Sequence, residues 1–386
     1  MKILIMLTYY RPHTSGLTIY AERLARGLAA RGHTVTVLTS HTHVPRSHPH
    51  ETMEDGVRVV RAPVLFRVSK GVIMPTIGFL ATREVLRHDI VCLHLPQFDA
   101  AGVALRGRLL GKPTTLTYHC DLKLPPGLFN VVVNQAVHAM NRLAGLFSDR
   151  VIAYTQDFAD HSPFLCAFRR KVEIIPPPVE LPQAGPGAVA AFAQMHGLDG
   201  SGPVIGMAAR LASEKGVEVL LNALPRVLKA YPNARVLFAG QHKNVMGEET
   251  YARRLAPLFR RYEDKGHWKF LDILNPLQMA AFYPNLDVIL VPSLNSTESF
   301  GLVQVEAMLS GVPSIASDLP GVRQPVLQSG MGKIVPVGDS AALAEAIIEV
   351  IGDKSAYTRP RQEIADRWST EHTAAGYEAL FKCLLT

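Results

Sequence analysis

The chain has 386 residues, of which 48% are apolar and 19% charged, so it can fill the cores of two domains and is not disordered. Its 40 lysines and arginines outnumber its 33 aspartates and glutamates, and the formal net charge of +7 favours anionic partners such as phosphorylated small molecules. No basic run is interleaved with aromatic residues, so nucleic acid is excluded from the expected partners. The four cysteines have no metal-finger or C-x-x-C spacing, which indicates reduced thiols in a cytoplasmic protein.

Short apolar runs alternate with amphipathic helical patterns along the N-terminal half, as in a parallel sheet built from βαβ units. Residues 2–7 predict a buried first strand, because no signal-peptide cleavage site follows them. A loop over residues 11–16 then opens a helix over residues 18–31. Further strands are predicted at residues 34–39, 57–62, 90–95, 114–118, 151–154 and 172–175.

A second βα series follows a linker rich in proline and glycine at residues 176–187. Its strands are predicted at residues 204–208, 234–238, 268–271, 287–291 and 314–316, with helices near residues 188–196, 216–230 and 249–262 and a further helix after Gly301. We therefore expect two Rossmann-like α/β domains whose parallel sheets face a central cleft. The predicted domains are residues 1–178 and 179–364, followed by a C-terminal helix over residues 365–386 that crosses back to the first domain.

Two loops at strand ends carry candidate anion-binding groups, because ligands of open parallel sheets lie beyond the carboxyl ends of the strands. The loop Arg11-Pro-His-Thr-Ser-Gly16 leaves the first strand and begins a helix, where a phosphate or a plain structural turn would fit equally well. In the second domain, Arg210 and Lys215 follow the first strand and could neutralise a diphosphate. The alternative for that loop is a solvated turn.

The segment ESFGLVQVE places Glu298 in a loop and Glu306 inside the helix that follows. A helix starting near Gly301 would leave the amides of residues 299–302 without helical partners, and such amides form an anion site. Compensation of the helix dipole could explain either glutamate singly, but not both across a Phe-Gly turn. A hydrolytic acid and base pair would not need the adjacent anion-binding loops.

His119 ends the predicted strand of residues 114–118, where a histidine is more often a core or surface group than a functional one. A histidine-rich stretch at residues 41–50 imitates a metal site, although its proline and serine neighbours favour a mobile loop. Neither feature identifies a function without further information.

Taken together, these motifs resemble the retaining sugar-nucleotide glycosyltransferases of family 4, which have the two-domain GT-B architecture. The resemblance spans essentially the whole chain and is most specific in ESFGLVQVEAM, followed by Gly311-Val-Pro313, and in the loop of Arg210 and Lys215. It implies that the chain is a hexosyltransferase that retains anomeric configuration and uses a UDP- or GDP-sugar without a metal or other cofactor.

The same resemblance implies a role for each candidate residue. Arg210 and Lys215 would hold the donor diphosphate and stabilise the leaving group, while Glu298 would contact the donor sugar. Glu306 would accept the ribose hydroxyls, and His119 would face the transferred sugar. The remaining donor-binding positions would be Gly16, Ser299, Phe300, Gly301 and Leu302.

The acceptor is less well defined by the sequence. Apolar stretches at residues 64–80 and 122–133, with Arg67 and Lys70 in the first, could be core or could contact an anionic membrane surface. We expect a glycan or lipid-linked acceptor, used in polysaccharide or glycolipid biosynthesis, and a peripheral enzyme at the inner face of the cytoplasmic membrane. The alternatives are a catalytically silent sugar-nucleotide-binding subunit of a glycan-assembly complex and an epimerase or phosphorylase of similar architecture.

Overall fold

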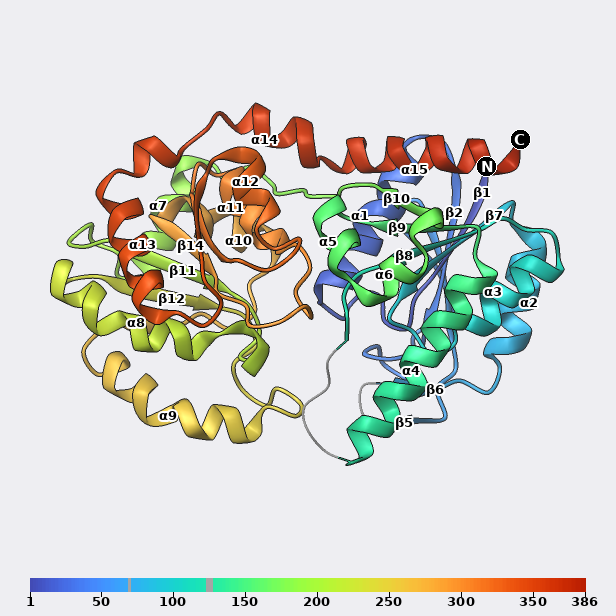
Figure 1. Ribbon diagram of the computed structural model, residues 1–386, viewed down its shortest axis with the longest axis horizontal. Coiled ribbons are helices and arrows are strands. Elements are labelled where there is room, and N and C mark those ends of the chain that lie inside the picture. The colour runs from blue at the N-terminus through green and yellow to red at the C-terminus, as the bar shows by residue number, and fades with distance from the viewer. Residues whose placement is uncertain (69–70, 123–127) are drawn as a thin grey trace. The chain divides into compact units, whose positions relative to one another are not determined.

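Each half of the chain folds around its own β-sheet in the computed structural model (Figure 1), which describes residues 1–68, 71–122 and 128–386. The chain divides into two compact units. Unit 1 consists of Met1–Val179 and Trp368–Thr386, and unit 2 is Glu180–Arg367. The prediction of two α/β units with parallel sheets is confirmed.

Unit 1 has an eight-stranded sheet in the order β10-β9-β8-β7-β1-β2-β4-β3, parallel except for the pairing of β3 with β4. The central strand β1 is apolar and buried because it pairs with β2 on one side and β7 on the other. The elements are β1 (Lys2–Met6), α1 (Gly16–Ala30), β2 (Thr34–Ser40), β3 (Glu51–Glu54), β4 (Val57–Ala62), β5 (Phe66–Val68), β6 (Gly71–Ile73), α2 (Ile77–Arg87), β7 (Ile90–Leu95), α3 (Ala100–Leu109), β8 (Thr114–Tyr118), α4 (Leu128–Phe147), β9 (Arg150–Ala153), α5 (Gln156–His161), α6 (Pro163–Ala167), β10 (Val172–Ile174) and α15 (Thr370–Leu385).

Unit 2 has a six-stranded parallel sheet in the order β13-β12-β11-β14-β15-β16. One face of this sheet is buried against α8, α9 and α13, whose apolar side chains share a single core with the strands. The elements are α7 (Pro186–His196), β11 (Val204–Ala208), α8 (Val217–Ala230), β12 (Arg235–Ala239), α9 (Glu249–Glu263), β13 (Trp268–Phe270), α10 (Pro276–Phe282), β14 (Val288–Val291), α11 (Leu302–Met308), β15 (Ser314–Ser317), α12 (Gln324–Ser329), β16 (Gly332–Val335), α13 (Ser340–Gly352) and α14 (Arg361–Trp368).

The C-terminal residues form two helices where the sequence predicted one. Ser369 separates α14 from α15 because its side chain accepts a hydrogen bond from the amide of His372 at 3.1 Å and so caps a new helix. Helix α15 packs against α1 within unit 1, where the hydroxyl groups of Tyr377 and Tyr20 lie 2.7 Å apart. The last helix of the chain therefore belongs to the core of unit 1.

Candidate functional site

The strand order of unit 2 reverses between β11 and β14, which are neighbours in the sheet although two strands separate them in the chain. Loops at such a reversal diverge and leave a crevice beyond the carboxyl ends of the strands. The loop after β11 carries Arg210 and Lys215, and the loop after β14 carries Glu298. The topology therefore brings these three predicted residues to one edge of one sheet.

The two loops also touch each other. The Lys215 ammonium donates to Oε2 of Glu298 at 2.6 Å, and both side chains are about four-fifths buried. The next residue, Gly216, has a φ of 69°, and a Cβ atom there would lie 2.0 Å from the carbonyl oxygen of Pro292. Only glycine allows this approach, so Gly216 fixes Lys215 beside the loop of Glu298. Arg210 pairs with Glu214 in its own loop at 3.1 Å.

Glu298 is held as a carboxylate by its surroundings. Burial alone would raise the pKa of Glu298, but the Lys215 charge and the amides of Gly301 and Phe300 outweigh burial and lower that pKa. The Gly301 amide donates to Oε1 of Glu298 at 3.0 Å. Two of the four amides expected to face an anionic ligand, those of Phe300 and Gly301, thus face a carboxylate of the chain itself. Ser299 and Phe300 are buried, and Leu302 begins α11.

Glu306 lies in the second turn of α11, with 7% of its surface exposed. Its Oε2 atom accepts a hydrogen bond of 2.8 Å from the hydroxyl group of Tyr283, which is fully buried. Tyr283 follows α10 directly, in a short 3-10 turn (Tyr283–Asn285). A carboxylate this deeply buried is costly unless it has a donor, and Tyr283 supplies one.

In unit 1 the strand order reverses between β1 and β7, and Gly16 lies after β1 at the start of α1. Ser15 and Thr18 form a reciprocal capping box that fixes this helix start. Among the described residues, no atom beyond its chain neighbours would lie within 4 Å of a Cβ atom at Gly16, and Gly16 is exposed. Packing within the chain therefore does not require glycine at this position.

His119 follows β8 and is buried among other polar rings. Its Nε2 atom shares a hydrogen bond of 2.9 Å with Nδ1 of His94, and its Nδ1 atom is bonded to the hydroxyl group of Tyr154. Burial lowers the pKa of His94 to about 3, and burial together with His94 lowers that of His119. Both imidazoles are consequently neutral at physiological pH. The ring nitrogens of His119 are engaged with side chains of unit 1 itself.

The sequence analysis missed His94, Tyr154 and Tyr283. His94 lies in a strand with no exposed residue, where a polar side chain must find a buried partner, so its position was a usable signal. Tyr283 and Glu306 are 23 residues apart, and no sequence pattern joins them. The structure places the unit 2 candidates in two adjoining loops and in helix α11, which follows the second loop, while His119 and Gly16 are residues of unit 1.

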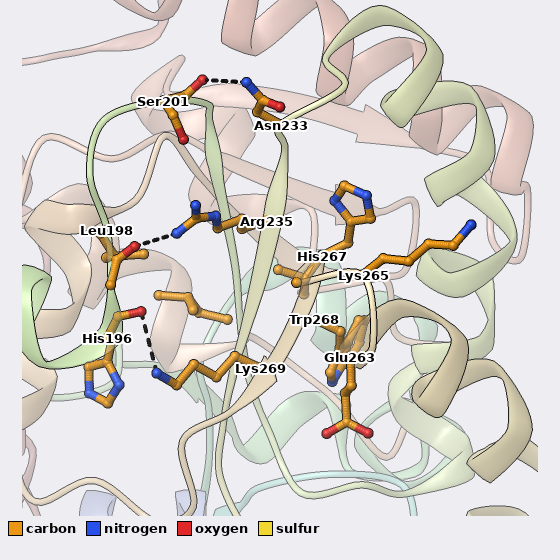
Figure 2. A pocket seen from close by; sticks show the side chains of 14 residues that line it. His196, Leu198, Ser201, Asn233, Arg235, Glu263, Lys265, His267, Trp268 and Lys269 are labelled. Carbon is orange, nitrogen blue, oxygen red and sulfur yellow. Dashed lines mark hydrogen bonds between the residues drawn. The ribbon is translucent and has the colours of Figure 1, made fainter.

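A cavity of about 580 Å³ lies at the other edge of the unit 2 sheet, at the amino ends of β12 and β13 (Figure 2). Figure 2 shows Arg235 and Lys269 pointing toward the end of α7. Arg235 donates to the carbonyl oxygen of Gly197, and Lys269 donates to that of His196 at 3.3 Å. These bonds satisfy the last carbonyl groups of a helix. Helix capping accounts for Arg235 and Lys269, and the residues of the predicted site lie elsewhere.

Two further features concern metals and membranes. Within the described part of the chain, no three histidine, cysteine, aspartate or glutamate side chains are grouped so that they could hold a metal ion. The histidine-rich stretch instead forms bonds to backbone, such as His41 Nε2 with the carbonyl oxygen of His48 at 2.9 Å. Among the same residues, no helix combines the length and the apolar character needed to cross a bilayer.

Two protein-family models match the chain, one in each unit. "Glycosyl transferase 4-like domain" matches residues 15–178, and "Glycosyl transferases group 1" matches residues 190–367. Together they cover most of both units.

Individual relatives extend over nearly the whole chain. D-inositol 3-phosphate glycosyltransferase of Segniliparus rotundus is 28% identical, over 96% of this chain and 85% of the relative. Phosphatidyl-myo-inositol mannosyltransferase of Mycobacterium tuberculosis is 26% identical, over 91% of this chain and 88% of the relative. The crystal structure of Anabaena HepE in complex with UDP-glucose shares the fold with a TM-score of 0.78, at 19% identity over 99% and 100% of the two chains.

Proposed function

This chain belongs to the family 4 glycosyltransferases of the GT-B fold, and we propose that it is a retaining enzyme that transfers a hexose from a UDP- or GDP-sugar without a metal ion. The proposal depends above all on the contact of Lys215 with Glu298 at the strand-order reversal of unit 2. A cation and an anion there offer complementary groups to a donor that is itself part phosphate and part sugar.

Lys215 and Arg210 are the proposed diphosphate-binding residues. Both follow the carboxyl end of β11, and both are cations whose present partners are carboxylates of the chain. A diphosphate presents the same kind of acceptor oxygens with more negative charge, so it competes well for these two side chains. As the bond to the sugar breaks, charge develops on the leaving phosphate, and the two cations stabilise it as a divalent ion does in other enzymes.

The two glutamates are proposed to divide the rest of the donor. Release of Lys215 to the diphosphate leaves Glu298 with acceptor capacity for sugar hydroxyl groups, next to the amides of Phe300 and Gly301. Glu306 would accept the ribose hydroxyl groups from within α11. Ser299 and Leu302 complete the proposed donor-binding segment, because they flank the turn that connects Glu298 to the helix.

Unit 1 is proposed to supply His119 and Gly16. Since both ring nitrogens of His119 are bonded within unit 1, its proposed contact with the transferred sugar uses the ring edge or the backbone rather than proton transfer. Gly16 is proposed as a donor-binding residue because no contact among the described residues explains the absence of a side chain there. A ligand phosphate approaching the start of α1 would explain it.

The acceptor is proposed to be a glycan or a lipid-linked molecule, used at the inner face of the cytoplasmic membrane. One curated relative is named for a phosphatidyl-inositol substrate. Three apolar side chains of the β5–β6 hairpin are exposed in this chain, at 69% for Leu65, 53% for Phe66 and 38% for Ile73. We call these three residues the hairpin patch. Lys70 and residues 123–127, which belong to the same prediction, lie outside the described residues.

The test of this function is the loss of turnover when a proposed leaving-group cation is removed. UDP- and GDP-sugars are first screened for stabilisation of the full chain against thermal unfolding, because a selective ligand raises the melting temperature. With the sugar so identified, Lys215→Ala and Arg210→Ala should each lower kcat by about 10²–10³-fold, the usual loss for one group that stabilises transition-state charge.

The matched control is Lys229→Ala, which removes an exposed cation from α8 in the same unit. It should leave kcat unchanged. Arg210→Ala and Lys229→Ala should keep the melting temperature of the wild type within a few degrees, while Lys215→Ala should lower it because Glu298 loses a buried partner, so kcat is compared at a temperature where all variants are folded. Near-normal turnover in both Lys215→Ala and Arg210→Ala would contradict the proposed function.

A further inference from the structure

We propose that Tyr283 is a positioning residue for nucleotide recognition: it holds the Glu306 carboxylate in the orientation that receives the ribose hydroxyl groups. The inference rests on the proposed role of Glu306 and adds a residue that no motif identified. Its basis is the 2.8 Å hydrogen bond that the Tyr283 hydroxyl group donates to Oε2 of Glu306. Tyr283 is fully buried and is therefore shielded from direct contact with a ligand.

The backbone around Tyr283 is fixed by the helix that precedes it. Helix α10 starts with Asn275 as its N-cap, in a reciprocal capping box with Gln278, and has Pro276 in its first turn. Its last residue, Phe282, packs against Phe192 of α7 with a ring separation of 6.2 Å. The Tyr283 ring lies 5.3 Å from the Phe282 ring and is fully buried, so it cannot swing away without opening a cavity and its hydroxyl group is a fixed donor.

Glu306 needs such a donor more than an exposed glutamate would. A glutamate side chain has three rotatable bonds, and its carboxylate plane is free to turn unless an oxygen is bonded. A bond from Tyr283 to Oε2 fixes that plane and leaves the carboxylate with further lone pairs for donors. A ribose diol supplies two hydroxyl donors, and it gains most from a carboxylate whose direction is set in advance.

A purely structural explanation is that Tyr283 only satisfies a buried charge and contributes to stability alone. The two explanations differ in what the Tyr283→Phe variant of the full chain does to nucleotide binding. If Tyr283 positions Glu306, the Kd for UDP or GDP should rise about ten-fold, which is the loss of one hydrogen bond to a charged group. The KM for the sugar donor should rise with it, while kcat should stay near the wild-type value.

The readout specific to ribose is a comparison of UDP and GDP with their 2′,3′-dideoxy counterparts, measured by calorimetry. Tyr283→Phe should lose the affinity difference between the two forms, because the dideoxy nucleotide offers no hydroxyl group to Glu306. The matched control is Tyr262→Phe, which removes another buried hydroxyl group of unit 2, one that donates to the carbonyl oxygen of Leu221 at 3.4 Å. It should bind both forms as the wild type does.

Glu306→Asp is the second variant, in case Tyr283→Phe folds poorly. It shortens the side chain, so that the carboxylate no longer reaches Tyr283, and it should likewise lose the affinity difference between the nucleotides and their dideoxy counterparts. Glu306→Ala separates the two claims. If Glu306→Ala weakens UDP or GDP binding and Tyr283→Phe does not, the positioning role is wrong and the proposed function stands. If Glu306→Ala binds both nucleotides as the wild type does, or the wild type binds neither, the role of Glu306 fails and the inference fails with it.

Discussion

At the scale of single residues, the 2.6 Å pair of Lys215 and Glu298 stabilises two side chains of the proposed donor site in the absence of a donor. Two charges that are mostly removed from water are costly apart, so each stabilises the other while no ligand is present. In the proposed complex, a diphosphate would replace Glu298 as the partner of Lys215, and sugar hydroxyl groups would replace Lys215 as the partner of Glu298. In this exchange each of the two charged side chains keeps a partner, which lowers the cost of emptying and refilling the proposed site.

The His94 and His119 pair gives a prediction for stability against pH. The pKa values of both imidazoles are lowered in the folded chain, mainly by burial, to about 3 for His94. In the unfolded chain the two imidazoles take up protons below pH 6.5, whereas in the folded chain they do not. Their contribution to the free energy of unfolding is therefore complete above pH 6.5 and is lost progressively below it, for His94 as pH falls toward 3. In that range, each histidine should lower the free energy of unfolding of unit 1 by up to about 1.4 kcal/mol for each unit by which pH falls.

The measurement is the opening free energy of β7 from hydrogen exchange at pH 7.5, 6.0 and 5.0. His94→Asn keeps a polar atom near the position of Nδ1 but does not titrate. Its opening free energy should therefore depend less steeply on pH, by the slope that corresponds to the uptake of about one proton. His372→Asn, at an exposed position of α15, should follow the wild type. Parallel curves for the wild type and His94→Asn would show that His94 is protonated in the folded chain.

The same residues show what part of the site could be predicted from the sequence. The positions of charged groups that follow a strand, such as Lys215 and Glu298, could be predicted because the pattern of apolar residues indicates where strands end and loops begin. The contact between Lys215 and Glu298 could not be predicted, because it depends on the close approach of the Gly216 and Pro292 backbones, which only glycine allows. The hydrogen bond from Tyr283 to Glu306 could not be predicted for a similar reason. A tyrosine in an apolar stretch is predicted to be a core residue, and only the packing determines where its hydroxyl group points.

At the scale of elements, the contact between α1 and α15 depends on one small residue. A Cβ atom at Gly27 would lie 2.8 Å from Cγ2 of Thr370 and 3.1 Å from the Cβ atom of Ala374. Gly27→Val should therefore push α15 away from α1 and lower the free energy of unfolding of unit 1 by about 1–3 kcal/mol, as overpacking does.

Ala30→Val provides the comparison for this variant, because Ala30 is exposed on the same helix and carries the same cost of a branched side chain. Denaturant unfolding followed in unit 1 should show the difference between the two. Equal destabilisation by both variants would mean that α15 can shift without cost.

The strands were predicted more closely than the helices. Residues 57–62, 90–95, 114–118 and 204–208 are strands with the predicted bounds, because they are short runs rich in β-branched and apolar residues that end at polar loops. The short hairpin strands β5 and β6 were not predicted, since three residues carry too little pattern. The division between α14 and α15 was missed because the Ser369 cap interrupts a periodic stretch without a glycine or proline.

At the scale of the whole molecule, the exposed hairpin patch predicts an affinity for membranes. With a net charge of +7 and three exposed apolar side chains on one hairpin, the chain should sediment with phosphatidylglycerol vesicles at low salt. The double variant Leu65→Ser with Phe66→Ser should weaken this binding about ten-fold, because it removes two side chains that a bilayer would bury.

The control for vesicle binding is Met195→Ser with Leu277→Ser. These residues of unit 2 are exposed to a similar extent, at 75% and 69%, so the control loses comparable apolar surface without touching the hairpin patch. It should bind vesicles as the wild type does. Sedimentation that is absent in the wild type, or equal in the two double variants, would contradict membrane contact through the patch.

Unit 1 is assembled from two segments, and the second of them, Trp368–Thr386, is translated only after all of unit 2. The hydroxyl group of Tyr377 in that segment forms hydrogen bonds with those of Tyr20 and Thr117. Thr117 lies two residues before His119. On the ribosome, unit 2 can thus fold while unit 1, which carries His119, still lacks a core helix. A chain cut short before residue 368 would retain the proposed donor loops and lose the support behind His119, so we expect it to bind the proposed donor without transferring the sugar.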